Sequence, residues 1–352
     1  MQSLESCYKD IAQEYLRWSY YGKDAPDINE KWKNNHDAYD FLKNYFDFGG
    51  KSKVFEDEYL TQHEKYIKDR SCHIISTYLL GIMIAEFFQI YTDKRDRNNM
   101  NFKYRWFLSC LYHDVGYAYE NKFDCSRLTT VRDRGIDGFV NEFNLEYVDD
   151  IEFKPFIREE VDLYLRCRAD CRKSKPVIDH GIAGGLMLYE KLRKQFEKAW
   201  MKRDNSKDSR QSFYVRHSTG NRTLHYSEDH FEEYAEAANT IIAHNIWIST
   251  LKDYITKYGN DRMLRDYTPI GLDNQICFIL SIADTIEPLK RDFKYIDKVY
   301  IEGITGQKGF CISTDADTFS DLYCNIKKLE DWIEVSVEVT NDGSNKLIRI
   351  MV

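Results

Sequence analysis

A histidine next to an aspartate is the first feature of this sequence that could do chemistry, because imidazole and carboxylate groups together can bind a metal ion. The dipeptide occurs at His36-Asp37 and at His113-Asp114, whereas composition alone predicts about one occurrence. His36-Asp37 lies in the polar segment NNHDAYDFL, which is typical of a helix start. His113-Asp114 follows the apolar run WFLSCLY, where two ionisable groups are costly to bury unless something neutralises them. A bound metal ion would do so.

Four further polar residues occupy similar settings, each in an otherwise apolar segment with helical periodicity. They are His73 in RSCHIISTYLL, His180 in DHGIAGGLML, His244 in AANTIIAHNIWI and Asp284 in ICFILSIADTI. A single histidine on an apolar helix is more often a hydrogen-bonded core residue than a ligand. Five apolar segments that each carry such a group make that explanation weak, so we expect these residues to meet.

Helical periodicity dominates up to about residue 295, and five prolines in the whole chain leave long helices uninterrupted. The clearest predicted helices cover 71–88, 102–112, 156–171, 181–200, 229–246 and 273–290. The charged segment 201–227 has no apolar period, so it is predicted to be a surface loop or a partly disordered insertion.

The pattern changes after about Lys298. VYIEGI, GFCIST, EVSVEVT and KLIRIMV alternate as strands do, and DLYCNIKKLEDWI between them has helical periodicity. The sequence Asn341-Asp342-Gly343-Ser344 favours a hairpin turn. We therefore expect a mostly α fold, with a helical domain over 1–297 and a small α+β subdomain over 298–352. The subdomain has no histidine and is expected to supply no metal ligand.

Composition argues against several classes of protein. The formal net charge of −8 argues against a protein that binds nucleic acids in general, because such proteins usually carry an excess of positive charge. No segment approaches the roughly 20 apolar residues of a membrane span, and the N-terminus lacks the pattern of a signal peptide. The nine cysteines form no CxxC pair, which predicts reduced thiols and a cytoplasmic protein. An anionic substrate would need a local attraction such as bound cations.

The order of four of these residues resembles the signature of the HD superfamily of metal-dependent phosphohydrolases: His73, then His113-Asp114, then Asp284. His180 and His244 fall where dinuclear members of that superfamily have additional ligands. Arg70, three residues before the first histidine, and the L-x-H-D-x-G context of 111–116 are also similar. The resemblance covers roughly residues 65–290.

Two positions depart from relatives within that superfamily. Tyr117 stands where many members, including HD-GYP cyclic-di-GMP phosphodiesterases and inositol oxygenase, have a lysine. Asn245 follows His244 where HD-GYP proteins have a second histidine. The first departure removes a contact to the substrate. The second argues against a third metal ion and against cyclic di-GMP as the substrate.

The resemblance implies an HD-type helical bundle that binds two divalent ions. The first ion would be held by His73, His113, Asp114 and Asp284; the second by His180 and His244, with Asp114 as the bridge. Manganese, iron, cobalt, nickel and zinc all suit these ligands, and magnesium is also compatible with the second site. A water activated by the ions would attack phosphorus.

The resemblance also implies a group of residues that act on the substrate. Asp114, Arg70 and Tyr117 are the expected catalytic residues, although Tyr117 could equally pack against its neighbours. Further cations that could contact phosphate are Arg127, Arg132, Arg134 and Lys290, but such residues are more often solvated surface charges.

The expected function is hydrolysis of a small phosphoester, such as a nucleotide or a cyclic nucleotide. Two alternatives stay open: a di-iron oxygenase of the HD type, and a regulatory binding module that retains the fold. Iron with oxygen consumption would identify the oxygenase, and phosphate release with manganese or magnesium the hydrolase. Assembly of several copies of the chain is also left open.

Overall fold

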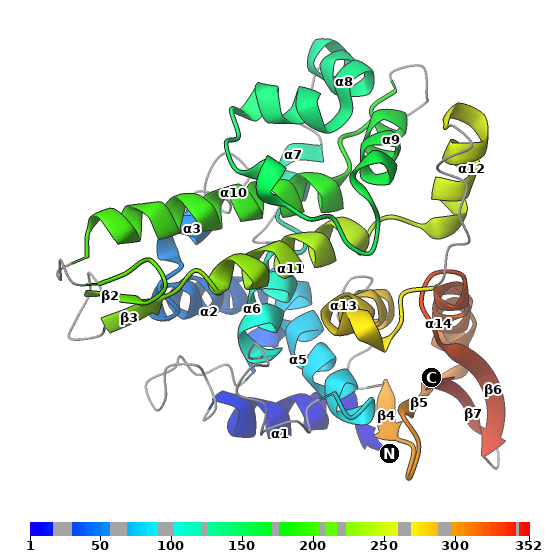
Figure 1. Ribbon diagram of the computed structural model, residues 1–352. Helices are drawn as coiled ribbons and strands as arrows, with labels where there is room; N and C mark the ends of the chain where they lie inside the picture. Colours follow the sequence, from blue (N-terminus) through cyan, green and yellow to red (C-terminus); the bar gives the residue numbers. More distant parts are fainter. Residues whose placement is uncertain are drawn as a thin grey trace.

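The computed structural model (Figure 1) describes residues 1–16, 30–56, 69–90, 102–120, 125–170, 176–203, 208–216, 223–259, 269–287, 298–342 and 345–352. Most of these residues are helical, and a small antiparallel sheet lies toward the C-terminus, so the predicted mostly α fold class is confirmed. No helix in these ranges is long and apolar enough to cross a membrane.

The helices, in chain order, are α1 (Leu4–Leu16), α2 (Asn35–Phe48), α3 (Ser52–Phe55), α5 (Ser71–Phe87), α6 (Phe102–Tyr112), α7 (Tyr117–Glu120), α8 (Cys125–Phe143), α9 (Arg158–Arg168), α10 (His180–Met201), α11 (His230–Ala243), α12 (Ile248–Tyr258), α13 (Gln275–Ile286) and α14 (Ala316–Lys327). The strands are β1 (Gln2–Ser3), β2 (Phe213–Arg216), β3 (Thr223–Tyr226), β4 (Tyr300–Gly303), β5 (Gly309–Ser313), β6 (Ser336–Asp342) and β7 (Asn345–Met351).

Helix α5 forms the centre of the helical part. Its sequence is apolar on every face, and all residues from Ser71 to Ala85 are buried, as expected of a helix surrounded by others. It packs against α1, α2, α6 and α13. A Cβ on Gly81 would overlap the ring of Trp106, so this glycine lets α6 approach α5 closely. That approach places the start of α5 beside the end of α6.

Helices α10 and α11 form a closely packed pair that runs across the molecule (Figure 1). A Cβ on Gly185 would lie 2.5 Å from the carbonyl oxygen of Ala238, so only glycine permits this spacing. Since α10 starts and α11 ends at the same side of the molecule, His180 and His244 are brought together there.

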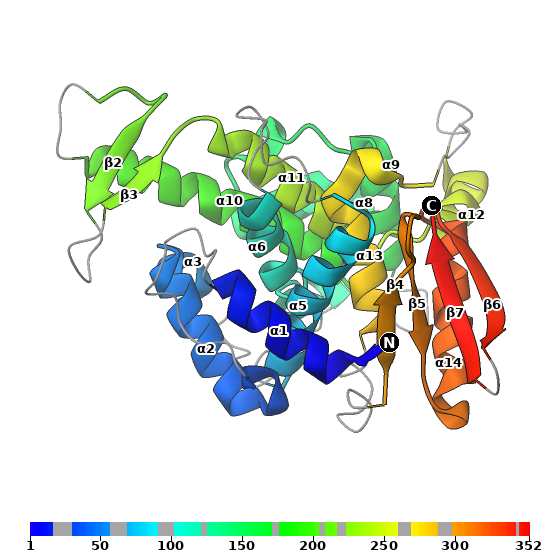
Figure 2. The same cartoon turned by 90° about the horizontal axis from the view of Figure 1, so that it is seen from below.

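The C-terminal part forms the predicted small sheet with a helix. The strand order is β1-β4-β5-β7-β6, and all neighbours are antiparallel; β6 and β7 form the predicted hairpin. Figure 2 shows the sheet beside α13, with the N-terminus next to β4. Phe310 on β5 packs against Phe87 and Phe88 at the end of α5, with ring centroids 5.5 and 5.9 Å apart. The proposed division between 297 and 298 borders residues outside the described ranges and stays a prediction.

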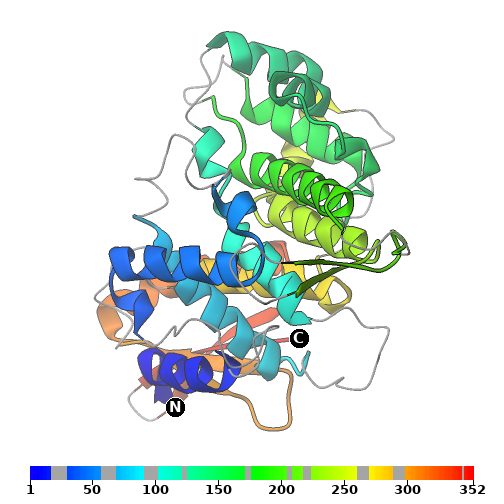
Figure 3. The same ribbon diagram turned by 90° about the vertical axis from the view of Figure 1, so that its left-hand side faces the viewer.

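The segment 201–227 differs from the expected loop in its described part, where β2 and β3 form an antiparallel hairpin. Phe213 and Tyr226 face each other across the two strands, with rings stacked 5.4 Å apart. Both pack against Phe196 of α10. Figure 3 shows the hairpin beside α10 and α11 and near the end of α2. The charged neighbours of these few apolar residues hide the strand pattern in the sequence.

Candidate metal centre

The six predicted ligands meet at one place, where five helices begin or end. His73 lies in the first turn of α5 and Asp284 in the last turn of α13. The other four lie at helix boundaries: His113 and Asp114 directly after α6, His180 at the start of α10 and His244 directly after α11. All are buried except Asp284, whose side chain is 17% exposed.

The first group of ligand atoms has the spacing that a metal ion requires. The Nε2 atom of His73 lies 3.2 Å from Asp284 Oδ1 and 3.4 Å from Asp114 Oδ2. The Nε2 atom of His113 lies 3.5 Å from Asp284 Oδ1 and 3.4 Å from His73 Nε2. Ligand atoms about 2 Å from a shared ion lie about 3 to 3.5 Å from one another. These four side chains could therefore hold one ion.

A second group shares Asp114 with the first. One ligand atom each from Asp114, His180 and His244 lies within 4.8 Å of the others, and the rings of His180 and His244 are 5.4 Å apart. The ring of His244 is also 5.6 Å from that of His113. Asp114 is therefore the residue that the two groups share.

The orientation of the imidazoles follows from where the helices end. The last carbonyls of a helix lack partners within the helix. His113 Nδ1 donates to the carbonyl oxygen of Cys110 at 2.6 Å, and His244 Nδ1 donates to that of Ile241 at 2.5 Å. Both bonds span three residues, and both turn Nε2 toward the centre. A backbone carbonyl on the other ring nitrogen is a common way to orient a metal-binding histidine.

His73 is oriented by a residue that the sequence analysis missed. Its Nδ1 donates to Glu287 Oε2 at 2.7 Å, and Glu287 is buried directly after α13. The available signal was a second acid three residues after Asp284, on the same side of an apolar helix. Glu287 thereby fixes the ring whose Nε2 faces the first group.

The electrostatics of the centre suit a cation. Burial raises the pKa of Asp114, but the charges of His113 and Arg70 outweigh this and hold it well below its usual value. Burial lowers the pKa of His73, yet hydrogen bonds to Asp114, Asp284 and Glu287 raise it to about 10. The carboxylates thus attract a positive charge, which a metal ion would supply in place of the proton.

The pKa of His244 is shifted in the opposite direction, to a lower value. Burial and the nearby charge of His113 lower its pKa to about 4. It is therefore neutral at physiological pH, which is the form of imidazole that binds a metal.

Arg70 and Tyr117, the other expected catalytic residues, also lie at this centre. Arg70 Nε donates to Asp114 Oδ2 at 2.8 Å, and its guanidinium lies 4.2 Å over the ring of Tyr117. That ring stacks on His180 with centroids 3.8 Å apart and an angle of 14°. Arg70 thus lies beside the first group and Tyr117 beside the second.

Asp179 and Asn245, the sequence neighbours of His180 and His244, are paired with each other. Asn245 Nδ2 donates to Asp179 Oδ2 at 2.6 Å, and Asp179 also caps α10 by accepting the N–H of Ile182. Burial raises the pKa of Asp179 to about 6. The pair joins the start of α10 to the end of α11. Glu120 is the acid near the second group, with Oε2 4.0 Å from His180 Nδ1.

The other cations named from the sequence are placed elsewhere or lie outside the described ranges. Arg127 pairs with Glu142, Arg132 pairs with Asp133, and Arg134 is exposed on α8; Lys290 is not among the described residues. His36 is 84% exposed and lies within 4.0 Å of Asp37 and Asp40, as expected for a surface helix start.

Three comparisons with known proteins gave no match for this chain: no protein-family model, curated protein or solved structure matches it. What can be stated is a helical protein with buried histidine and aspartate side chains that could hold metal ions.

Proposed function

We propose that the protein is an HD-type, metal-dependent hydrolase of small phosphoesters, with nucleotides and cyclic nucleotides as the first substrates to test. One observation carries this proposal: Asp114 belongs to both groups of buried residues that could bind a metal ion. Two ions bridged by a carboxylate would generate a hydroxide nucleophile at neutral pH and stabilise charge on phosphoryl oxygens.

The ligand set supports transition metals. Four imidazoles and two carboxylates suit manganese, iron, cobalt, nickel or zinc, with magnesium compatible at the second group. Asp114 has a lowered pKa and His244 is neutral, so both are in the form that binds a cation without first losing a proton.

The remaining residues have roles that follow from their positions. Arg70, Tyr117 and Asp284 are less buried than the other five proposed ligands, which favours substrate entry on their side. Tyr117 keeps its proton because burial raises its pKa, so its hydroxyl is a donor for a phosphate or leaving-group oxygen. Arg70 holds Asp114 in place and adds positive charge near the phosphate.

Metal analysis combined with a substrate screen tests the proposal. The chain supplies a matched pair of variants, because it has a buried and an exposed His-Asp dipeptide. With manganese, iron or magnesium present, Asp114→Asn is expected to lower the rate of phosphoester hydrolysis at least about 100-fold. Asp37→Asn, at the exposed dipeptide, should leave it unchanged.

Three outcomes would contradict the proposal that the protein is a hydrolase. Hydrolysis that survives Asp114→Asn would place the reaction elsewhere. Oxygen consumption by an iron-loaded protein without phosphate release would favour the oxygenase. Purified protein that binds ions but turns over neither class of substrate would favour a regulatory binding module.

A further inference from the structure

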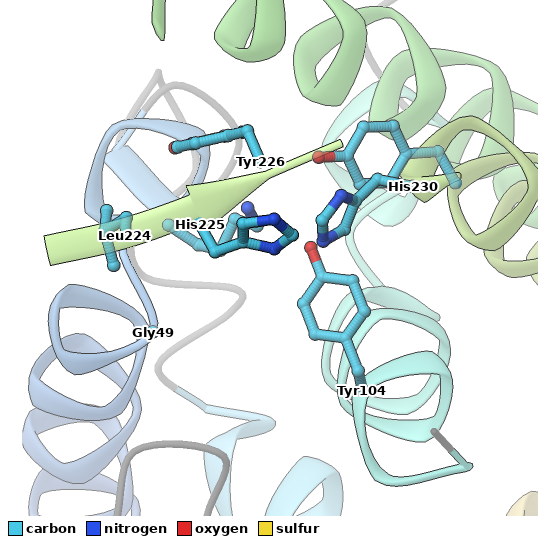
Figure 4. A pocket seen from close by; sticks show the side chains of 8 residues that line it. Gly49, Tyr104, Leu224, His225, Tyr226 and His230 are labelled. Atoms are coloured by element: carbon cyan, nitrogen blue, oxygen red, sulfur yellow. The ribbon is translucent and has the colours of Figure 1, made fainter. Parts of the chain in front are cut away.

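A polar pocket lies away from the candidate metal centre, and we call it the hairpin pocket. It is lined by Gly49, Lys51, Tyr104, Leu224, His225, Tyr226, His230 and Tyr234 (Figure 4). The pocket is small and partly open to solvent, so any group that enters it must also be small.

The hairpin pocket is separate from the proposed catalytic site. Tyr104 precedes His113 by nine residues on and just after α6, which corresponds to roughly 14 Å along a helix. Tyr234 precedes His244 by ten residues on and after α11, or roughly 15 Å. The two sites therefore lie toward opposite ends of the same two helices.

Lys51 is the unusual residue of the pocket, because it is only 4% exposed. Its Nζ atom lies over the rings of Tyr104, Tyr226 and Tyr234, at 5.7, 5.6 and 5.9 Å from their centroids. Aromatic faces attract a cation but carry no net negative charge. Within the described ranges, no carboxylate oxygen lies within 4.0 Å of this ammonium group.

The acid whose charge acts on Lys51 is Glu233, which is buried and whose carboxylate lies 3.9 Å from His230 Nε2. Burial lowers the pKa of Lys51 to about 8, which shows how costly this ammonium is where it lies. A small anionic ligand beside this ammonium group would offset the cost of burying its charge.

His225 Nε2 already contacts Ser212 Oγ at 3.1 Å, so the groups that can donate hydrogen bonds to such an anion are His225 Nδ1, His230 Nε2 and the Tyr104 hydroxyl. Figure 4 shows the His225 and His230 rings and the Tyr104 hydroxyl directed toward one another. The ring centroids of the two histidines are 6.1 Å apart, and those of Tyr104 and His230 are 5.7 Å apart. The Nδ1 atom of His230 is 2.9 Å from the backbone of Ser227, which fixes the ring. No carboxylate is among the lining residues.

We propose that the hairpin pocket binds a phosphate-type oxyanion, with Lys51 as its counter-charge and the Tyr104 hydroxyl and the two imidazoles as hydrogen-bond donors. The β2–β3 hairpin then has a role, since it supplies Leu224, His225 and Tyr226 and closes the pocket over Lys51. Gly50 has φ +68°, and a Cβ there would lie 2.5 Å from Leu224, so the turn and the hairpin are fitted to each other.

The test is the thermal stabilisation of the protein by inorganic phosphate, compared with chloride at equal ionic strength. It is made in an Asp114→Asn background, so that phosphate bound at the metal centre does not contribute. A ligand that binds only the folded state raises the midpoint of unfolding with its concentration. Lys51→Met keeps the length of the side chain and removes its charge. Lys43→Met, at an exposed position on α2, is the matched control.

Phosphate is expected to raise the midpoint in the Asp114→Asn protein and in its Lys43→Met derivative. The Lys51→Met derivative should show at least a ten-fold weaker apparent affinity for phosphate. Sulfate should act like phosphate, and a phosphomonoester that binds more tightly would identify a phosphorylated metabolite as the source of the group. Equal stabilisation with and without Lys51 would overturn the proposal, as would no stabilisation in any of the proteins. Because both variants carry Asp114→Asn, the result does not depend on the proposed hydrolase activity.

Discussion

At the scale of single residues, the metal centre depends on histidines at helix ends. His113 and His244 both follow the last residue of a helix and donate Nδ1–H to a carbonyl three residues earlier. Carbonyl groups of the last helical turn therefore aim Nε2 at the centre. His73 lies at a helix start, away from the carbonyl end of its helix. Glu287 orients its ring instead, by accepting a hydrogen bond from Nδ1.

We expect His180→Ala and His244→Ala each to lower metal content from two ions per chain toward one, and to reduce turnover severely. Each variant removes a proposed ligand of the second group and leaves all four residues of the first. Metal analysis after dialysis measures the change, and His36→Ala, at an exposed histidine, should change nothing. Two retained ions in the double variant would contradict the dinuclear assignment.

Lys51 should lower stability at neutral pH. Its pKa is about 8 in the folded protein, against 10.5 for an unperturbed lysine, so the folded state disfavours the ammonium. Lys51→Met is therefore expected to raise the free energy of unfolding at pH 7 by up to about 3 kcal/mol. Because the folded-state pKa is lowered, the gain is full below pH 8 and shrinks as pH rises toward 10.5.

Denaturant unfolding between pH 7 and pH 9.5, in phosphate-free buffer, measures this difference. Lys43→Met should stay within about 0.5 kcal/mol of the original protein, as exposed substitutions usually do. A Lys51→Met protein that is less stable at pH 7 would mean that the ammonium contributes to the fold.

At the scale of elements, glycines set how closely the helices of the centre approach. A Cβ on Gly116 would lie 1.7 Å from the carbonyl oxygen of His180, so the turn after Asp114 touches the start of α10. The Asp179–Asn245 hydrogen bond joins that start to the end of α11. The two contacts together fix the spacing between Asp114, His180 and His244.

Gly116→Ala should displace the start of α10 and weaken the second group of ligands more than the first. We expect a loss of about 1–3 kcal/mol in the free energy of unfolding, as for other overpacked sites, and metal content closer to one ion per chain. Gly49→Ala is the control, because its nearest contact would be an ordinary 3.4 Å. A Gly116→Ala protein that binds two ions with unchanged affinity would show that this contact does not position the centre.

At the scale of the whole molecule, the C-terminal sheet shares its core with the helices. Phe310 of β5 packs on the end of α5, Trp332 packs on Trp247 with centroids 5.1 Å apart, and β1 from the N-terminus forms the edge of the sheet. Strand β5 contacts α5 and helix α14 contacts α13, and these two helices carry His73 and Asp284. The role of the C-terminal part in the structure is therefore to support these two helices.

Phe310→Ala should cost about 3–5 kcal/mol, because it removes a fully buried ring between the sheet and α5. Unfolding followed by far-UV circular dichroism and by tryptophan fluorescence should give coincident curves, since both parts share one core. Metal content at low temperature should not change, because the subdomain supplies no ligand. Tyr300→Ala, at a side chain that is 43% exposed, serves as the control, and separate transitions would indicate two independent domains.

The sequence by itself determined the helices of the centre and the residues that meet there. Apolar periodicity and the placement of His73, His113, Asp114, His180, His244 and Asp284 in apolar segments are local properties, so they can be read without a structure. The alternating C-terminal segments and their hairpin follow for the same reason. The activity itself stays a proposal, because the same fold can carry different functions.

Only the tertiary structure decided which groups lie within bonding distance of one another. The pairing of Asp179 with Asn245 and the role of Glu287 depend on distances between helices, which no local pattern encodes. The β2–β3 hairpin is stabilised by contacts of Phe213 and Tyr226 with Phe196, which belongs to a separate helix. Lys51 is likewise an ordinary residue in the sequence, and it becomes a buried cation only because three tyrosines from separate elements close around it.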